Sequence, residues 1–207
     1  MTIIDKLSTS LGRRDEVPNQ ELARQIAADS DKNAVKELFE HLHNKNKGIQ
    51  SDCIKVLYEI GECKPGLISQ YLDTFLNLLQ SKNNRLVWGA MTALAGITAF
   101  DPKGIYEILP QILDAANKGS VITKDQAVSI LVKLAAIPEY TDKALTLLLE
   151  LMQTCPTNQL PMYAENALPV ISENWRKEFA ALLTKRMPEI EKESKQKRVA
   201  KVIKKLS

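Results

Sequence analysis

The chain has 207 residues, of which 44% are hydrophobic and 26% charged, a balance typical of a folded globular protein and not of a disordered segment. Its 8 glycines and 9 prolines are few for an all-β fold, which needs a turn about every ten residues. The net charge of +3 is too small to indicate nucleic-acid binding by itself. These values predict a helical protein with an aliphatic core.

The charge is unevenly distributed along the chain. Residues 185–205 carry nine Lys or Arg side chains against three Glu, which leaves 19 basic and 22 acidic residues elsewhere. The rest of the chain is therefore slightly negative, which is unfavourable for following a DNA backbone. Any contact with phosphate groups is expected at the C-terminal end.

Cysteine usage and hydropathy exclude several further classes. The three cysteines have no C-x-x-C spacing, so we predict neither a disulfide framework nor a zinc site. The N-terminus shows no basic and apolar leader, and the longest uncharged run, residues 86–100, is too short to cross a bilayer. We therefore expect a cytoplasmic protein without a membrane segment, a metal or a cofactor.

The sequence repeats with a period of 37 residues, which is its strongest signal. Small residues recur within an apolar pattern at Cys53, Ala90, Ala127 and Ala164 and, after 36 residues, at Ala200. A second register contains Ala34, Tyr71, Ile108, Leu145 and Leu182, and a third contains Leu38, Phe75, Ile112 and Leu149. Apolar residues around these positions have i, i+3, i+4, i+7 spacing, so each period predicts two helices.

In chain order, residues 1–30 are expected to form an irregular N-terminal cap. Five two-helix repeats should follow in a single domain, at about 31–64, 65–101, 102–137, 138–173 and 174–207. Polar loops rich in Asn, Ser, Lys and Gly separate the two helices of a repeat, and their Asn or Ser residues suit the N-cap of the second helix. Pro169 falls inside the fourth second helix and is expected to kink it.

Three segments resemble HEAT repeats. Residues 108–113, Ile-Leu-Pro-Gln-Ile-Leu, are similar to the first helix of such a repeat, and residues 90–95 and 198–203 to the second. The resemblance implies an all-α, right-handed α-α superhelix of the HEAT or armadillo type, without identifying a subfamily. HEAT repeats often carry a ladder of Asp and Arg. The Arg-equivalent positions here are Gln50, Val87, Lys124, Pro161 and Lys197, so this ladder is not expected.

The second helices of such a stack usually line the binding face. Residues beside the small core position place Trp88, Asp125, Tyr163 and Arg198 on that face. They could form an aromatic platform with a carboxylate and a cation. Alternatively, Trp88 fills a gap between repeats and Asp125 caps a helix, because large aromatic side chains are usually buried.

The last helix carries only basic charges from residue 195 onward. Arg198, Lys201, Lys204 and Lys205 are among them, opposite the apolar side chains of Val199 and Ile203. One interpretation is that these basic side chains contact phosphate groups of a nucleic acid or an anionic surface. The alternative is a terminal capping helix that is polar for solubility and whose cations suit a helix C-terminus.

The sequence contains none of the common catalytic motifs, and we predict no catalytic residues. The favoured function is a non-enzymatic scaffold that binds a protein or peptide through its concave face. The alternative is a DNA-binding or DNA-repair protein, because Trp88, Asp125 and the basic last helix loosely resemble features of bacterial alkylpurine DNA glycosylases built from HEAT-like repeats. Nucleic acid would then be the partner.

Overall fold

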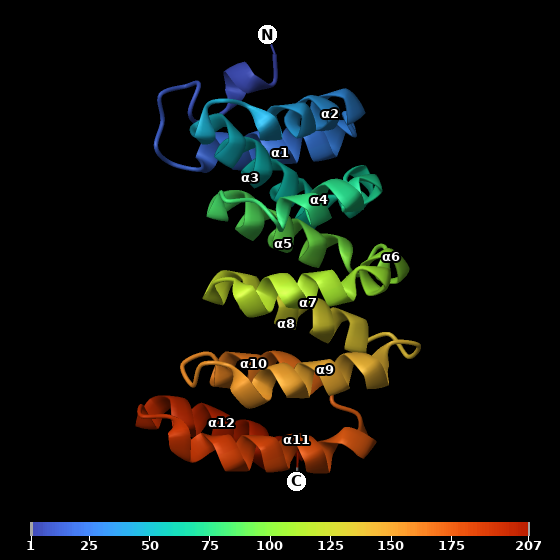
Figure 1. Cartoon of the computed structure of the whole chain (residues 1–207), viewed down its shortest axis with the longest axis vertical. Helices are drawn as coiled ribbons and strands as arrows, with labels where there is room; N and C mark the ends of the chain where they lie inside the picture. Colours follow the sequence, from blue (N-terminus) through green and yellow to red (C-terminus); the bar gives the residue numbers. More distant parts are fainter. Residues whose placement is uncertain (1, 207) are drawn as a thin grey trace. The chain divides into compact units, whose positions relative to one another are not determined.

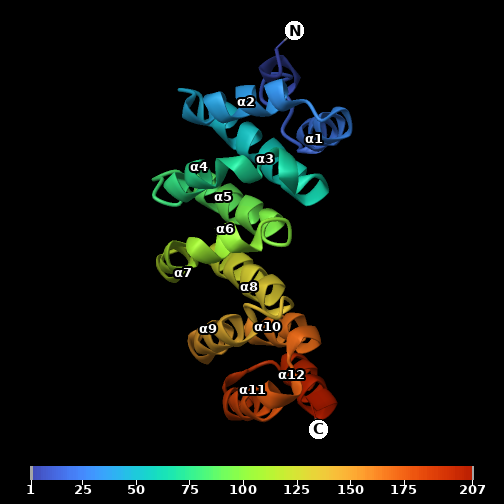
Figure 2. The ribbon, with the colours of Figure 1, turned by 90° about the vertical axis from the view of Figure 1, so that its right-hand side faces the viewer.

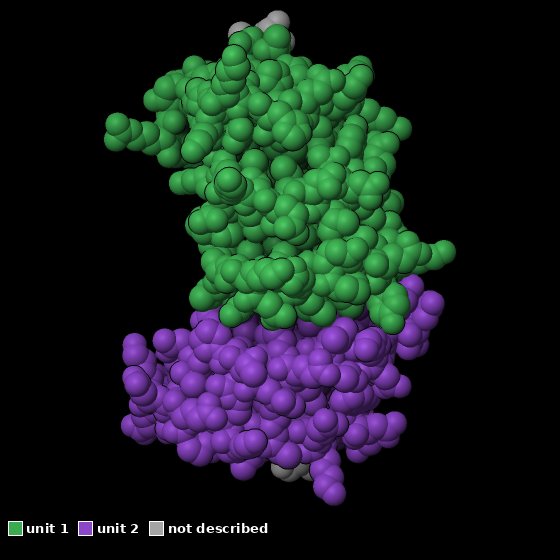
Figure 3. Space-filling view, viewed as in Figure 1, with its two compact units in different colours: residues 1–127 green, residues 128–207 purple. Residues whose placement is uncertain are grey.

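The computed structural model describes residues 2–206, and within them every regular element is an α-helix or a 3₁₀ helix (Figure 1). Contacts divide the chain into two compact units, one up to Ala127 and the other from Val128 onward (Figure 3). The division falls inside one helix, α8 (Val121–Ala135). Each unit is described in turn.

The first unit consists of successive helices joined by short turns and loops. Its α-helices before α8 are α1 (Val17–Asp29), α2 (Lys32–Glu40), α3 (Lys47–Cys63), α4 (Leu72–Leu78), α5 (Asn84–Ile97), α6 (Pro102–Glu107) and α7 (Leu109–Lys118). Short 3₁₀ turns are η1 (Ile4–Lys6), η2 (His41–His43), η3 (Pro65–Leu67) and η4 (Ser69–Tyr71). The first helix of the third repeat is broken between α6 and α7, and Pro110 lies in the first turn of α7.

Side chains cap the helices at the positions where the polar loops end. Asn46 accepts a hydrogen bond from the backbone N–H of Gly48 at the start of α3, and Asn83 accepts one from Arg85 at the start of α5. The two caps are 37 residues apart, so the cap repeats with the helix pair. Each cap satisfies a backbone donor that has no partner within the helix.

The N-terminal region is more regular than an irregular cap, because residues 17–29 form α1. This helix packs on α3, which in turn packs on α5 (Figure 2). Asp52 of α3 accepts hydrogen bonds from the side-chain amide of Asn19, at 2.8 Å, and from the backbone N–H of Thr9, at 2.7 Å. The segment that precedes α1 is thereby tied to the face of α3.

Glycines allow α3 and α5 to approach closely. A Cβ atom on Gly96 would lie 3.0 Å from the backbone carbonyl group of Gly61, and one on Gly89 would lie 2.3 Å from the Ile54 side chain. The close packing of α3 against α5 therefore requires glycine, which has no Cβ atom, at these positions. The small residues Cys53 and Ala90, both fully buried, also contribute to it.

The second unit contains α9 (Thr141–Thr154), α10 (Leu160–Ala167), α11 (Glu173–Arg186) and α12 (Glu193–Leu206), with 3₁₀ turns η5 (Leu168–Val170) and η6 (Met187–Glu189). In this unit α10 packs on α12 and α9 on α11. The expected kink at Pro169 is wrong: α10 ends at Ala167, and the proline lies in η5. Its missing N–H and its effect on the preceding residues end the helix there.

One buried cation joins the helix pairs of the second unit. Arg186, at the end of α11, donates hydrogen bonds to the carbonyl oxygens of Met152 and Cys155, both at 2.8 Å, and pairs with Glu189 at 2.7 Å. Burial acts to lower the pKa of Arg186, but the hydrogen bond and charge of Glu189, with a contribution from the Cys155 side chain, outweigh it and hold the pKa above its ordinary value. The guanidinium therefore satisfies carbonyl groups at the C-terminal end of α9.

The predicted core register is confirmed in four of its five copies. Cys53, Ala90, Ala127 and Ala164 are all fully buried. The fifth position is wrong, because Ala200 is exposed and Val199 is buried in its place. In α12 the buried stripe consists of Val199, Val202 and Leu206, so the helix is rotated by about one residue from the expected register.

Candidate functional site

Trp88 lies half-buried in a hollow on the face formed by α3 and α5. This Trp88 hollow encloses about 310 Å³. Its lining includes Glu16, Ser51, Lys55, Tyr58, Arg85, Thr92 and Ile122. Two aromatic rings and the exposed Ile122 side chain make it the more apolar part of the site, suited to a large side chain.

A second hollow opens beside it, between the N-terminal segment and the first turns of α3 and α5. This N-terminal hollow encloses about 670 Å³. Its lining includes Ser8, Arg13, Arg14, Asp15, Lys47, Asp52 and Asn84. It shares Glu16, Ser51, Lys55 and Arg85 with the Trp88 hollow, so the two adjoin.

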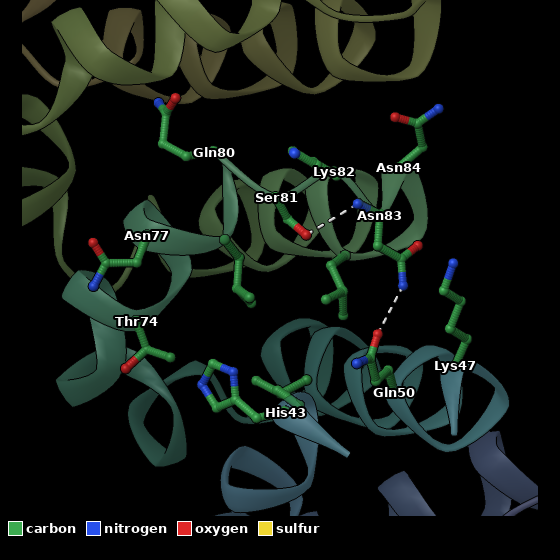
Figure 4. A pocket seen from close by; sticks show the side chains of 13 residues that line it. His43, Lys47, Gln50, Thr74, Asn77, Gln80, Ser81, Lys82, Asn83 and Asn84 are labelled. Atoms are coloured by element: carbon green, nitrogen blue, oxygen red, sulfur yellow. Dashed lines mark hydrogen bonds between the residues drawn. The ribbon is translucent and has the colours of Figure 1, made fainter. Parts of the chain in front are cut away.

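A third hollow lies where the loops before α3 and α5 come together (Figure 4). This cap hollow encloses about 690 Å³ and is lined largely by amides and lysines, among them Gln50, Asn77, Gln80 and Lys82, together with His43. Asn83 donates a hydrogen bond to Gln50 across the hollow at 2.9 Å. It shares Lys47, Asn83 and Asn84 with the N-terminal hollow.

The three hollows adjoin one another in the first unit, and together we call them the α3–α5 track. Its more apolar end contains Trp88, and its polar end contains the amides of the cap hollow. Shared lining residues connect each hollow to the next, so an extended chain could contact all three.

Most acidic groups in the track already have partners. Asp15 forms an ion pair with Arg13 at 2.8 Å, and its pKa is held below the ordinary value chiefly by that hydrogen bond. Glu16 pairs with Lys55 at 2.8 Å. Asp52 accepts the two hydrogen bonds that fix the N-terminal segment. Each of these carboxylates therefore already has a partner within the protein.

Lys55 lies at the floor of the track, with its side chain only 11% exposed. It contacts Glu16 and Glu59 and lies over the Tyr58 ring. Burial acts to lower its pKa, but the hydrogen bonds to the two glutamates outweigh it and raise the pKa. Lys55 thus joins the start of α1 to α3 and stays charged.

The sequence-predicted site is only partly assembled. Trp88 lines the track, and Asp125 lies half-buried on α8, three residues after Ile122 and hence on the same side of that helix. Tyr163 belongs to the other unit and is fully buried, so the expectation that it faces a ligand is wrong. The physical reason is packing: Tyr163 occupies the same row as the buried Gly89, which faces the neighbouring second helix.

The basic helix α12 is partly neutralised. Arg198 forms an ion pair with Glu165 of α10, and this hydrogen bond holds the pKa of Glu165 below its ordinary value despite partial burial. Lys197 pairs with Glu193 at 2.7 Å, and Lys195 donates to Asn158. Lys201, Lys204 and Lys205 are exposed.

The sequence patterns do not predict the residues that shape the track. The net charge outside residues 185–205 is slightly negative, so a sum over that region conceals the local cluster of Arg14, Lys47, Lys82 and Arg85. A local signal was present in the loops before the second helices, where Asn46 with Lys47 and Asn83 with Arg85 recur at nearly the same place in successive repeats.

Among the residues that the structure describes, no three His, Cys, Asp or Glu side chains come together in an arrangement that could hold a metal ion. In the same residues, no helix combines the length and the apolar character needed to cross a membrane.

Comparisons with known proteins identify the fold. No family model and no curated protein matches the sequence. A designed armadillo repeat protein, solved in complex with the peptide (KR)4, is similar in structure with a TM-score of 0.66 at 15% identity, over 99% of this chain and 98% of that one. An engineered protein gives a TM-score of 0.62 at 19% identity, over 100% and 98%. A HEAT-like repeat protein from Thermococcus onnurineus NA1 gives 0.48 at 15% identity, over 93% and 98%. The repeat pattern and the first two likenesses together show an all-α solenoid of the HEAT and armadillo type.

Proposed function

We propose that this protein is a binding scaffold that holds an extended segment of a protein partner in the α3–α5 track. The observation that carries the proposal is that the three hollows adjoin along consecutive second helices, each sharing lining residues with the next. A segment in this track would place a large side chain against Trp88 and its backbone against the amides of the cap hollow. Side-chain amides both donate and accept hydrogen bonds, as a peptide backbone requires.

The fold supports the proposal by analogy. The designed armadillo repeat protein with a similar structure was solved with a peptide bound. A similar fold does not assign a function, whereas the residues of the track can be tested directly. The track offers what a peptide site needs: an apolar hollow for an anchoring side chain and polar groups that fix orientation.

A selection from an unbiased library of displayed peptides tests the proposal. The wild-type protein should enrich a set of related peptides, and Trp88→Ala should lose them because the anchoring ring is gone. Phe100→Ala is the matched control, since Phe100 is an aromatic residue of the same unit that is 59% exposed and lies outside the track. Enrichment that is unchanged by Trp88→Ala, or no enrichment at all, would contradict the proposal.

Nucleic-acid binding through α12 is the weaker alternative. Three of the six basic side chains in residues 195–205 already contact Glu165, Glu193 or Asn158. The three exposed lysines that remain fit a solubilising terminal helix, which repeat arrays require at their ends. A DNA titration at two salt concentrations measures this alternative, since phosphate contacts weaken steeply as salt rises.

A further inference from the structure

Resting on the proposed function, we propose that the partner segment is acidic: an extended peptide whose Asp or Glu side chains contact Arg14, Lys47, Lys82 and Arg85. The four cations lie along the N-terminal and cap hollows, and Arg85 also borders the Trp88 hollow. All four residues are exposed. The charge of the track therefore specifies the class of peptide that it accepts.

Charge pairing supports this assignment. Lys55 and Arg13, the other cations of the track, are paired with Glu16 and Asp15. Within the described residues, no ion pair involves the four proposed contact residues, so their charges are not neutralised by the protein. The cap hollow has no Asp or Glu in its lining. An acidic chain would supply the missing counter-charges, and complementary charge increases both association rate and specificity.

The helix arrangement reinforces the positive potential. Helices α3 and α5 have 17 and 14 residues, and both begin at the track. The N-terminus of a helix carries a partial positive charge, which favours carboxylates nearby. Ser8 adds a separate observation: it lines the N-terminal hollow, is 4% exposed, and its hydroxyl has no hydrogen-bond partner among the described residues.

The designed armadillo repeat protein that resembles this chain in fold was solved with a basic peptide, (KR)4. The α3–α5 track calls for a peptide of the opposite charge, because its unpaired charged residues are cations. Shared architecture thus does not predict shared ligand charge. This difference makes the sign of the peptide charge the property to measure.

Fluorescence anisotropy with labelled octapeptides tests the inference on the full chain. The probes are (Glu-Asp)4, (Lys-Arg)4, (Ser-Gly)4 and a single-stranded DNA octamer. We expect (Glu-Asp)4 to bind most tightly and to weaken as salt rises from about 50 to about 300 mM, because exposed charges are then screened. The double variant Lys47→Glu/Arg85→Glu should weaken that binding by about tenfold or more, since two attractive contacts become repulsive.

The matched control is Lys32→Glu/Lys103→Glu, which changes the net charge equally at exposed positions outside the track. It should leave the affinity for (Glu-Asp)4 within about twofold of wild type, because distant surface charges are screened. Circular dichroism on both double variants checks that the helices are intact.

The outcomes separate the two proposals. Tighter binding of (Lys-Arg)4, (Ser-Gly)4 or DNA than of (Glu-Asp)4 would overturn the acidic assignment. If the library selection nevertheless yields peptides whose binding depends on Trp88, the proposed peptide-binding function stands and only the acidic assignment is lost. An equal loss of affinity for (Glu-Asp)4 in the track variant and in the control variant would likewise overturn the inference, because a general effect of net charge would then explain the binding. Absence of binding to every peptide, in the titration and in the library, would overturn both proposals.

Discussion

The carboxylate of Asp52 holds the N-terminal segment against α3, since it accepts hydrogen bonds from Thr9 and Asn19. Asn19 is 1% exposed, so its side-chain amide depends on protein partners. We expect Asp52→Ala to lower the free energy of unfolding by about 1–3 kcal/mol, because buried donors lose their acceptor. Urea denaturation measures the change. Asp29→Ala, at an exposed position on α1, should stay within about 0.5 kcal/mol of wild type, and an equal loss there would contradict this role for Asp52.

The three cysteines differ in reactivity because they differ in burial. Burial first, and then the nearby charges of Asp52 and Glu37, raise the pKa of Cys53 to about 12, so its thiol stays protonated at pH 8. Cys155 is 4% exposed, whereas Cys63 is exposed at the end of α3. Iodoacetamide at pH 8 should therefore modify one thiol rapidly in the folded protein. Mass spectrometry of wild type and of the Cys63→Ser variant checks this, and rapid labelling of that variant would be inconsistent with the packing of Cys53.

Single residues also show where sequence reasoning reaches its limit. The periodic small positions were predicted correctly because a residue between two close helices must be small, whatever its neighbours. The burial of Tyr163 was not, because it lies in the same register as Gly89, whose Cβ position faces Ile54 of the neighbouring second helix. An offset of one residue from the core stripe does not by itself distinguish a buried position from an exposed one.

At the scale of elements, the contact between α3 and α5 depends on glycine. Replacing Gly by Ala inside a helix ordinarily stabilises it by about 0.5–1 kcal/mol. Gly96→Ala should instead destabilise the protein by about 1–3 kcal/mol, because its Cβ would meet the backbone of Gly61 at 3.0 Å. Thermal unfolding, monitored by circular dichroism, shows whether the Gly96→Ala variant is more or less stable than wild type. An increase in Tm would show that the two helices are not packed this closely.

The helix pairs and their caps were largely predictable from the sequence. The loops that end in Asn46 and Asn83 were expected to supply N-caps, and both do. The α3–α5 track was not predicted, because its lining comes from the N-terminal segment as well as from two repeats. Glu16 reaches Lys55 across 39 residues, a contact that no local pattern encodes. The residues of the polar end were visible in the sequence, but their convergence required the fold.

For the molecule as a whole, stability in a repeat array is a sum of contributions from neighbouring elements. Deleting residues 173–207 removes α11 and α12, and with them the contacts of Arg186 and the buried Phe179. We expect the remaining chain to keep its helicity, to unfold at a lower urea concentration and to aggregate more readily. Peptide affinity should be unchanged, because the track lies within the first unit. Complete loss of helicity would show that the nearest-neighbour description fails.

The central claim is that a peptide occupies the track beside Trp88. The chain has two tryptophans, and the other, Trp175, lies in the second unit with its indole N–H bonded to Asp142 at 2.9 Å. In Trp175→Phe the fluorescence reports on Trp88 alone, and in Trp88→Phe it reports on Trp175 alone. Titration with a peptide enriched in the library selection should shift the emission of Trp88 saturably, because binding changes the solvation of a half-buried ring. The Trp88→Phe protein should show no shift. A saturable shift seen only in the Trp88→Phe protein, or binding by anisotropy with no change at Trp88, would contradict the placement of the peptide site.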